Sequence, residues 1–565
     1  MTTIADDVNK ALPPQHHFAG IFSAFQCPIS LNAARKSKNN PDILTFDQAM
    51  ASPDKDKWVK SAELEIKELE DHGCWEEVPL SEAQGHKIVP SQWVFRLKRR
   101  PDGTVTKHKG RIVLRGDLME DIYDVTSPVV AFSTVRLFLI MSLHLGWHTC
   151  SVDFSNAFIQ AKRPDKVFMH MPRGFKGKAG FILRLIRNVY GACDGPKLWS
   201  DLLFKSLRKL GFKQSQIDPC LWYKPNCFIV CFVDDCGIAT KDEKDADILI
   251  KQLEQMGFTL TKESSFEEFL GIQYAKLANG DVELTQEGLI KKILTATGLV
   301  TCNPNRIPAQ ASLGKDDDGA DMTDDWSYPS IIGMLLYLST NTRPDITFAV
   351  SQAARFTHSP KQSHAQAVKT IVRYLAKTLD KGTIVKKPNS AIKLDCYVDA
   401  DFAGLYKVEA DESINSAKSR SGYIIKLGGC PLIWKSQLIP TICLSTAESE
   451  YYSLSQSMRA LLPIQSLVSE FMERVEVPAH LRGVEKIVHA TAHEDNTSAL
   501  SLATEQRLTS RTRHYHCRWH FFWQAVQTGQ VEVIYCETQE QDADYMTKPL
   551  VFVTFIANRR RVQGW

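Results

Sequence analysis

Apolar residues recur at helical spacing in some stretches of the chain and form β-type runs in others. Residues 54–73 carry apolar side chains at helical spacing and end at Gly73, which predicts a helix. Two β-rich runs within residues 91–116 flank Pro101-Asp102-Gly103, a sequence typical of a turn. This arrangement predicts a β-hairpin.

The middle of the chain alternates between apolar and amphipathic segments. Residues 134–146 predict a buried helix that leads into a strand at 148–158, and residues 188–212 predict a turn followed by an amphipathic helix. Residues 227–240 form an apolar strand that two acids interrupt. Residues 276–385 are mainly helical in pattern, with an acidic stretch that predicts an exposed linker.

From Ala391 the pattern changes to strand, hairpin, helix, strand, helix, strand and helix. The segment 446–472 has apolar residues on one face of a long helix. This order predicts a separate α/β domain.

Composition limits the class of protein. At 565 residues the chain is too long for one hydrophobic core, so we expect three or four domains. Apolar residues make up 44% and charged residues 24%, which is an ordinary globular balance. No apolar run approaches the roughly 20 residues that cross a bilayer, and the start lacks the regions of a signal peptide. We therefore expect a soluble intracellular protein whose first 45 residues are poorly ordered.

The fourteen cysteines include no C-x-x-C pair. A zinc site needs paired ligands at close spacing, so we expect free, mostly buried thiols in a reducing compartment. His514, His516 and His520 lie near a helix start, and we expect structural or phosphate-facing roles for them rather than a metal site.

A net charge of +3 does not indicate a nucleic-acid-binding protein, but the basic residues are not evenly spread. Residues 96–100 and then 107–115 form a basic stripe with few acids between them. Such a stripe suits a phosphate backbone. A solvated, charged hairpin is an equally good reading of the same pattern.

Three acids interrupt apolar strands: Asp153, and the pair Asp234 and Asp235. A carboxylate planted in an apolar strand needs a cation nearby, and two divalent ions can clamp the attacking and leaving oxygens of a phosphoryl transfer. An exposed turn at the acid pair and a cap at Asp153 are the alternatives for each acid alone. Taken together, the strand, the turn before a helix and the Val-Asp-Asp hairpin follow the order of a polymerase palm.

From about Trp58 to Leu550 the chain resembles the reverse transcriptase of copia-type long-terminal-repeat retrotransposons. The matching motifs follow the family's order: SQWVFRLK, KGRIVLRG, TSPVVAFSTVRL, VDFSNAF, MPRGF, VYGACDGPKLW, FVDD, EFLGI, TRPDI and RTRHYHCRWHF. The resemblance implies an α+β and α/β multidomain fold, with a right-hand polymerase followed by a ribonuclease H-like α/β domain. It also implies boundaries at 1–45 (extension), 46–275 (fingers and palm), 276–388 (thumb or connection) and 389–565 (ribonuclease H-like).

By this resemblance Asp153, Asp234 and Asp235 are the metal-binding acids of the polymerase. The implied substrate-binding residues are Lys109 and Arg111 at the incoming triphosphate, Phe158 at the sugar, Tyr190 and Gly191 beneath the nascent base pair, and Phe232 before the acid pair. The ring at 232 lacks the hydroxyl of the family's usual tyrosine. Cys193-Asp194 stand where Lys-Gln is usual and Lys197 replaces Arg, which places an acid near the triphosphate pocket.

A second set of acids lies at predicted strand ends and helix starts in the last domain. Such positions suit a two-metal phosphodiesterase site, although Asp495 alone is more typical of a helix cap. The resemblance implies that the ligands are Asp399, Glu450, Asp495 and Asp544. Glu450 is preferred over Glu448 because it directly precedes Tyr451, and Asp401 is a weaker candidate on the strand of Asp399.

The family implies RNA-directed and DNA-directed DNA synthesis, together with cleavage of the RNA strand of RNA–DNA hybrids. It implies two Mg²⁺ or Mn²⁺ ions per site. The implied partners are a primer–template, the hybrid and deoxynucleoside triphosphates, with the integrase or capsid protein of the same element as further partners and no membrane. The expected location is a cytoplasmic virus-like particle, with the nucleus as the alternative. A catalytically inactive or domesticated nucleic-acid-binding remnant is the rival hypothesis.

Overall fold

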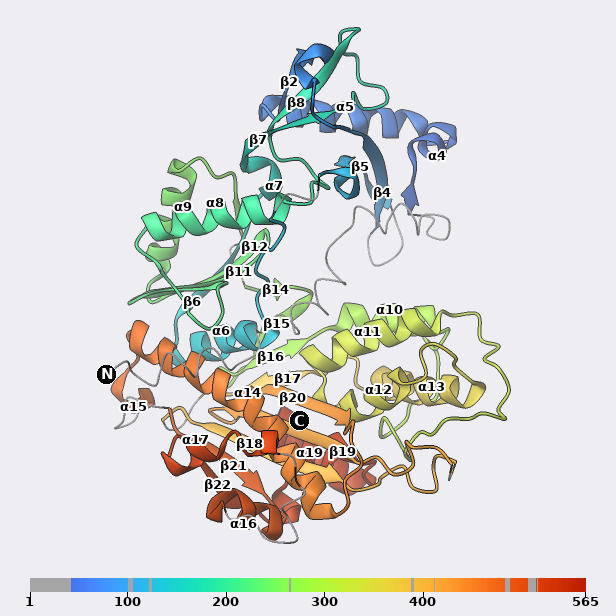
Figure 1. Cartoon of the computed structure of the whole chain (residues 1–565), viewed down its shortest axis with the longest axis vertical. Helices are drawn as coiled ribbons and strands as arrows, with labels where there is room; N and C mark the ends of the chain where they lie inside the picture. Colours follow the sequence, from blue (N-terminus) through green and yellow to red (C-terminus); the bar gives the residue numbers. More distant parts are fainter. Residues whose placement is uncertain are drawn as a thin grey trace.

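A computed structural model describes residues 42–99, 105–120, 124–263, 266–387, 391–410, 412–482, 488–506, 515 and 517–565. The chain order runs from an N-terminal part at the top of Figure 1, through a central sheet, to a group of helices and a C-terminal sheet at the bottom. Most of the expected N-terminal extension and the hairpin turn at 101–103 lie outside the described residues. Among the described helices, none has the length and apolar content needed to cross a membrane.

The described residues of the N-terminal part form two small sheets and two α-helices. The helices are α4 (Phe46–Ala51) and α5 (Lys55–Asp71). One sheet joins β1 (Ile43–Leu44), β4 (Ser91–Arg99) and β5 (Val105–Leu114), which confirms the predicted hairpin strands. The other joins β2 (Trp75–Pro79), β8 (Phe181–Arg187), β7 (Lys162–Met169) and β3 (Ile88–Val89).

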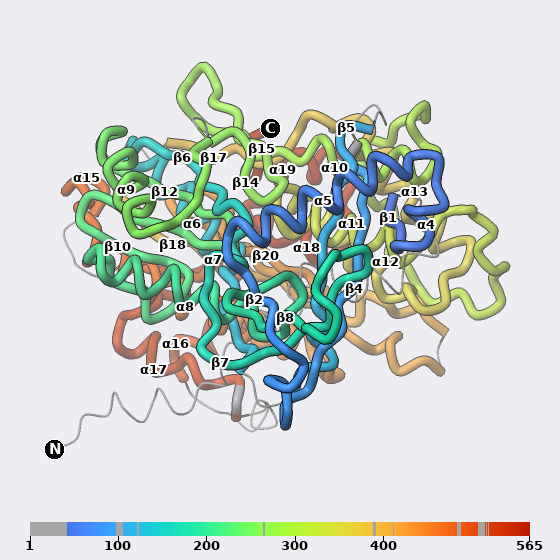
Figure 2. The backbone as a smooth tube through the Cα atoms, turned by 90° about the horizontal axis from the view of Figure 1, so that it is seen from above, coloured from blue at the N-terminus to red at the C-terminus, as the bar shows by residue number. Residues whose placement is uncertain are grey.

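Helix α5 forms where the apolar spacing predicts it, and it buries Trp58 and Leu69. The indole of Trp58 meets Phe95 of β4 edge-on at 5.3 Å, which attaches the helix to the hairpin. The helix stops before Gly73, whose φ of +62° is accessible to glycine at little cost. Seen from above, α5 crosses the front of the molecule (Figure 2).

The central sheet is antiparallel and has the order β13-β6-β12-β11-β10-β9. Its strands are β6 (His148–Asp153), β9 (Lys213–Gln214), β10 (Leu221–Lys224), β11 (Cys227–Phe232), β12 (Asp235–Thr240) and β13 (Thr261–Glu263). Helix α6 (Phe132–Leu145) packs on one face through Phe138, which contacts Phe228 at 5.3 Å. Helices α8 (Gly195–Lys209) and α9 (Glu243–Gln255) cover the other face, where Leu203, Leu207 and Leu253 line a small apolar cavity with the sheet.

The predicted strand at 148–158 is shorter than expected, because β6 ends at Asp153 and a short helix α7 (Ala157–Gln160) follows. Asn156 causes the change of direction: it adopts a left-handed φ of +52°, a conformation that asparagine tolerates better than most residues.

The predicted helical region contains α10 (Glu287–Ala296), α11 (Tyr328–Asn341), α12 (Thr347–Ala354) and α13 (Gln362–Lys377). A four-stranded sheet lies beside these helices: β14 (Glu268–Phe269), β15 (Ile272–Lys276), β16 (Val282–Thr285) and β17 (Thr383–Val385). Strand β15 crosses the expected boundary at 275/276. The acidic stretch forms no regular element, and Lys361 and Lys369 pair with its Asp321 and Asp324.

The C-terminal sheet has the order β20-β19-β18-β21-β22, with the first three strands antiparallel and the last two parallel. The strands are β18 (Leu394–Asp401), β19 (Arg420–Leu427), β20 (Cys430–Leu438), β21 (Ala490–Glu494) and β22 (Val531–Tyr535). The helices that flank them include α14 (Thr446–Arg474), α16 (Thr497–Glu505), α18 (Asp544–Thr547) and α19 (Phe552–Gln563). This order of elements confirms the predicted α/β pattern.

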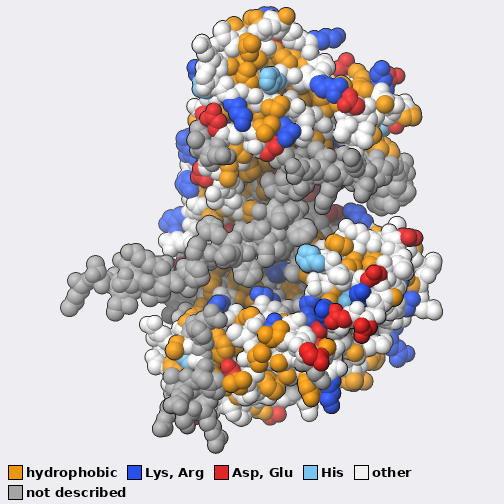
Figure 3. Space-filling view, turned by 45° about the vertical axis from the view of Figure 1, so that its right-hand side comes forward, with side chains coloured by type: hydrophobic (Ala, Val, Ile, Leu, Met, Phe, Trp, Pro, Cys, Tyr) orange, Lys and Arg blue, Asp and Glu red, His pale blue; other side chains and the backbone are white. Residues whose placement is uncertain are grey.

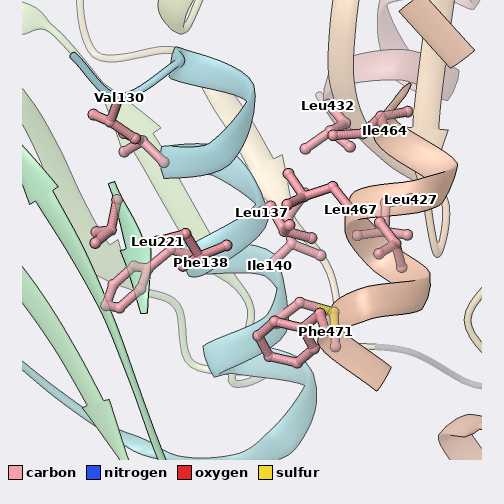
Figure 4. Packing of buried hydrophobic residues seen from close by; sticks show 14 of the residues in the cluster. Val130, Leu137, Phe138, Ile140, Leu221, Leu427, Leu432, Ile464, Leu467 and Phe471 are labelled. Carbon is pink, nitrogen blue, oxygen red and sulfur yellow. The ribbon is translucent and has the colours of Figure 1, made fainter. Parts of the chain in front are cut away.

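In the part of the chain that the structure describes, the C-terminal sheet shares its hydrophobic core with other regions. One continuous cluster of buried apolar residues joins the central sheet, α6, α14 and the C-terminal sheet. Figure 4 shows Leu137 and Ile140 of α6 facing Leu467 and Phe471 of α14. Because α6 is apolar around most of its surface, it is buried from both sides.

Candidate active sites

Three carboxylates meet at one end of the central sheet. Asp153 ends β6 and pairs in register with Asp235, the first residue of β12, while Asp234 lies in the two-residue turn between β11 and β12. The structure therefore brings together the three acids that the sequence singled out.

The turn that carries Asp234 is strained and firmly held. Val233 has a φ of +54°, an unusual value for a β-branched residue. The indole nitrogen of Trp199 donates to the Val233 carbonyl oxygen at 2.6 Å, and the backbone N–H of Phe154 donates to the Asp234 carbonyl oxygen at 3.0 Å. Strain of this kind persists where the surrounding structure fixes the backbone, and it is concentrated at functional sites.

Crowding of these acids changes their protonation. Burial, and then the neighbouring carboxylates of Asp234, Asp153 and Glu263, raise the pKa of Asp235 to about 7. Loss of water and the charge of Asp153 also raise the pKa of Asp234, whereas Arg111 lowers it. A divalent cation would relieve this repulsion and keep the acids ionised.

The side chains of Arg111 and Tyr190 contact each other beside the β4–β5 hairpin. The guanidinium of Arg111, on β5, lies 4.4 Å from the centre of the Tyr190 ring. The ring of Phe158, on α7, meets the same tyrosine edge-on at 6.2 Å. Three predicted substrate-binding residues therefore form one cluster, and Lys109 lies on the same strand as Arg111.

Gly191 is the residue that lets the loop at 190–193 approach β5. It has a φ of +87°, and a Cβ placed on it would lie 2.4 Å from the carbonyl oxygen of Leu114. The backbone N–H of Leu114 donates to the Tyr190 carbonyl oxygen at 2.7 Å. A side chain at 191 would therefore push Tyr190 away from Arg111.

The acid at position 194 is neutralised within the protein. The buried carboxylate of Asp194 accepts hydrogen bonds from Arg163 at 2.7 and 3.0 Å, and Lys197 pairs with Asp201 at 2.7 Å. Asp194, where the sequence departs from the family pattern, thus forms an ion pair with Arg163. Phe232 is 7% exposed and belongs to the core of the central sheet, so its nucleic-acid contact stays a prediction.

The basic stripe is partly neutralised. His108 lies 3.3 Å from Asp54, and Arg115 pairs with Asp117 at 2.7 Å. The side chains at 98–100 lie outside the described residues. On the face drawn in Figure 3, basic and acidic side chains are interspersed, in keeping with the small net charge.

The second carboxylate group lies at the C-terminal sheet. Asp399 of β18, Glu450 of α14 and Asp495, which directly follows β21, each offer a carboxylate oxygen, and these atoms all lie within 4.8 Å of one another. Asp544, the first residue of α18, interacts with Asp399. The four predicted ligands therefore come together from four segments.

The electrostatics resemble those of the first group. Burial is the main cause that raises the pKa of Asp399 to about 7 and that of Glu450 well above its usual value, and neighbouring acids add to both shifts. One Glu450 oxygen, Oε2, is buried without a hydrogen-bond partner. Hard divalent cations prefer carboxylate oxygens, so the donor set fits Mg²⁺ or Mn²⁺.

The structure also separates neighbouring candidates. Glu448 accepts a hydrogen bond from the backbone N–H of Leu444 at 2.6 Å, so it closes the start of α14, whereas Glu450 joins the carboxylate group. Asn496, not Asp495, caps α16, with bonds of 3.0 Å to two backbone N–H groups. Asp401 lies outside the set of three ligand atoms.

Two residues near this group were missed by sequence reasoning. Lys548 lies 2.8 Å from Asp544 and 3.8 Å from Asp399, and Glu494 is fully buried next to Asp495. The spacing of four between Asp544 and Lys548 was the available signal for the lysine.

The described part of the histidine group is structural in character. The Tyr451 hydroxyl and Nδ1 of His520 are 2.7 Å apart, and the His520 ring lies 4.3 Å from that of Trp523. His514 and His516 lie outside the described residues. Every cysteine that the structure describes is a free thiol.

Comparisons with known proteins agree with this arrangement. Residues 74–311 match the family described as reverse transcriptase (RNA-dependent DNA polymerase). The chain is 30% identical to the retrovirus-related Pol polyprotein from transposon RE1 of Arabidopsis thaliana, in an alignment that covers 88% of this chain and 33% of that protein.

Two further relatives give the same picture. The Pol polyprotein from transposon RE2 of Arabidopsis thaliana is 30% identical, with 93% of this chain and 35% of the relative covered. That from transposon TNT 1-94 of Nicotiana tabacum is 26% identical, with 89% and 37% covered. The chain thus spans about a third of the length of these relatives. The chain is therefore similar over most of its length to retrovirus-related Pol polyproteins of transposons, and residues 74–311 match the reverse transcriptase family.

Proposed function

We propose that this chain is an RNA-directed and DNA-directed DNA polymerase that also cleaves the RNA strand of RNA–DNA hybrids. The observation that carries the proposal is the pair of carboxylate groups, each at one end of the interior strands of its own sheet. In this reading residues 46–275 are fingers and palm, 276–388 are thumb or connection, and 389–565 are a ribonuclease H-like domain. The β20-β19-β18-β21-β22 order, with acids at the end of its central strand, supports the last assignment.

In the polymerase site Asp153, Asp234 and Asp235 would hold two divalent ions, which supply charge stabilisation at the attacking and leaving oxygens when bound. Arg111 and Lys109 would meet the triphosphate, with Arg111 held over the Tyr190 ring. The strained turn at Val233 fixes Asp234 relative to Asp153 before substrate arrives. Gly191 admits the Tyr190 loop to the pocket.

In the nuclease site Asp399, Glu450, Asp495 and Asp544 would hold the ions. Lys548 compensates part of the negative charge of Asp399 and Asp544. Thr547 donates a hydrogen bond to Asp399 and thereby orients its carboxylate. The substrates would be a primer–template, deoxynucleoside triphosphates and the RNA–DNA hybrid, within a cytoplasmic virus-like particle.

The rival function is a catalytically inactive or domesticated nucleic-acid-binding protein. This function predicts a different result: such a protein would bind nucleic acid but would extend no primer. The intact geometry of both carboxylate groups favours the enzyme.

Primer extension on an RNA template and cleavage of a labelled RNA–DNA hybrid, each with Mg²⁺ or Mn²⁺, test the proposal. Asp234→Asn should reduce incorporation by at least about a hundredfold while hybrid cleavage stays near the parent rate, and Glu450→Gln should do the reverse. Each change removes the charge of a ligand and nearly keeps its shape. Normal extension by the Asp234→Asn protein would refute the palm assignment, and an inactive parent chain would favour the rival function.

A further inference from the structure

We propose that Glu68 and Asn156 are a positioning pair that sets the orientation of Tyr190, and through it the sugar and triphosphate contacts of the nucleotide pocket. The inference rests on the proposed polymerase function and adds two residues to that site. Asn156 lies between Asp153 and Phe158 in the VDFSNAF motif, but the resemblance gave neither Asn156 nor Glu68 a role.

The side-chain amide of Asn156 is engaged at both ends. The hydroxyl of Tyr190 donates to Oδ1 of Asn156 at 2.6 Å, and Nδ2 of Asn156 donates to Oε1 of Glu68. Because an ionised carboxylate only accepts hydrogen bonds, Glu68 fixes which end of the amide faces it. The oxygen is thereby directed toward Tyr190.

Asparagine also satisfies the backbone at this position. Residue 156 has φ +52° and ψ +44° between β6 and α7. Asparagine and aspartate tolerate this left-handed conformation, but aspartate lacks the N–H donor that Glu68 requires. The backbone and the hydrogen-bond pattern therefore select the same residue.

Tyr190 transmits the effect to both sides of the pocket. Its ring carries the Arg111 guanidinium at 4.4 Å on its face and contacts Phe158 at 6.2 Å. Rotation of this ring would displace the cation assigned to the triphosphate and the aromatic assigned to the sugar. Burial raises the pKa of the Tyr190 hydroxyl, so it remains a donor to Asn156 throughout the working pH range.

Helix α5 thus reaches the pocket from two positions. Glu68 holds Asn156, and Glu65, which lies one turn earlier and is buried, accepts a hydrogen bond from the backbone N–H of Ile112 beside Arg111. The helix connects the N-terminal hairpin to the end of β6 that bears Asp153. A shift of α5 would therefore reach Tyr190 through Asn156.

A double-mutant cycle tests the pair. Asn156→Asp keeps the acceptor for Tyr190 but removes the donor and faces one carboxylate with another. We expect kcat/KM for a deoxynucleotide to fall by about tenfold, mainly through KM, with a lower ratio of deoxynucleotide to ribonucleotide kcat/KM. Glu68→Gln alone should cost about twofold or less, because its amide oxygen can still accept from Asn156.

The double variant, Glu68→Gln with Asn156→Asp, exchanges donor and acceptor and keeps the net charge of the pair. It should recover to within about threefold of the parent in both kcat/KM and sugar ratio. Glu70→Gln, at an exposed position on the same helix, is the matched control and should leave both unchanged. Hybrid cleavage should be the same in all variants, which excludes a general folding defect.

The outcomes are distinguishable. A double variant no better than Asn156→Asp, or a sugar ratio that does not move, would overturn the pair while leaving the polymerase assignment intact. If the parent chain itself extends no primer, the proposed polymerase function is wrong, and the proposed role of the pair is wrong with it. Recovery in the double variant supports both.

Discussion

At the scale of single residues, acids placed in apolar strands were the informative signal. Burying an unpaired carboxylate is unfavourable, so Asp153 and Asp399 stand out in their strands without any structural knowledge. Asn156, which contacts Tyr190 and Glu68, and Thr547, which contacts Asp399, could not be predicted in the same way. Both act through individual hydrogen bonds, which leave no periodic trace in the sequence.

Glu65 makes a prediction at this scale. Burial raises the pKa of its carboxyl to about 7 in the folded protein, against about 4.5 for an exposed glutamate. Below the lower value both states are protonated and nothing is lost. Above about pH 7 the folded protein must hold a buried carboxylate that the unfolded chain ionises freely, so stability falls as pH rises between these values.

Glu65→Gln should therefore stabilise the protein at pH 8 by up to about 3 kcal/mol, and by much less at pH 5. Denaturant unfolding at the two pH values measures the difference. Glu63→Gln, exposed on the same helix, is the control and should change little at either pH. An equal gain at both values would mean that ionisation of Glu65 is not the cause.

At the scale of elements, long helices and the central strands were predictable because their apolar spacing is regular. Strands β2, β7 and β8 escaped sequence analysis because β2 pairs with a segment about a hundred residues away and β7 has an irregular register. The strand predicted at 148–158 was too long, because the left-handed backbone of Asn156, which ends the extended segment, gives no hydrophobic signal. Strand pairing and a left-handed backbone conformation depend on tertiary structure, so local sequence patterns do not reveal them.

The β11–β12 turn provides a prediction about an element. Glycine is normally less favourable than alanine by about 1 kcal/mol within regular structure, but at a left-handed φ the order reverses. Val233→Gly should therefore be more stable than Val233→Ala by about 1 kcal/mol, since both lose the valine side chain and only glycine relieves the backbone. Comparison of the two unfolding free energies measures it, and a more stable alanine variant would show that the turn is not strained.

At the scale of the whole molecule, the change of sequence texture near Ala391 predicted a separate domain, and its sheet order bears out the α/β pattern. The same sequence pattern could not reveal that α6 packs against both the central sheet and α14. Contact between the buried sides of α6 and α14 depends on how two distant segments meet. Arg136 illustrates the connection: it donates to the carbonyl oxygens of Leu432 and Thr340 at 2.7 Å, so it joins three regions of the chain.

A continuous core implies that the two sheets unfold together. Phe471 of α14 contacts Phe228 of the central sheet at 4.8 Å and is completely buried. Phe471→Ala removes a large side chain from this junction, and it should lower the free energy of unfolding by about 3–5 kcal/mol. Because the core is continuous, amide exchange should accelerate to a similar degree in β11–β12 and in β18–β21.

Hydrogen exchange resolved by peptide measures both sheets in one experiment. Phe521→Ala, at a side chain that is 40% exposed in the same C-terminal region, should leave both sheets protected and serves as the control. If Phe471→Ala loosened only β18–β21, the central sheet would be stable without its neighbour and the two carboxylate groups would belong to independent bodies. Equal loosening would mean that a change in α14, which carries both Glu450 and Phe471, alters the stability of the central sheet and of the carboxylate group at its end.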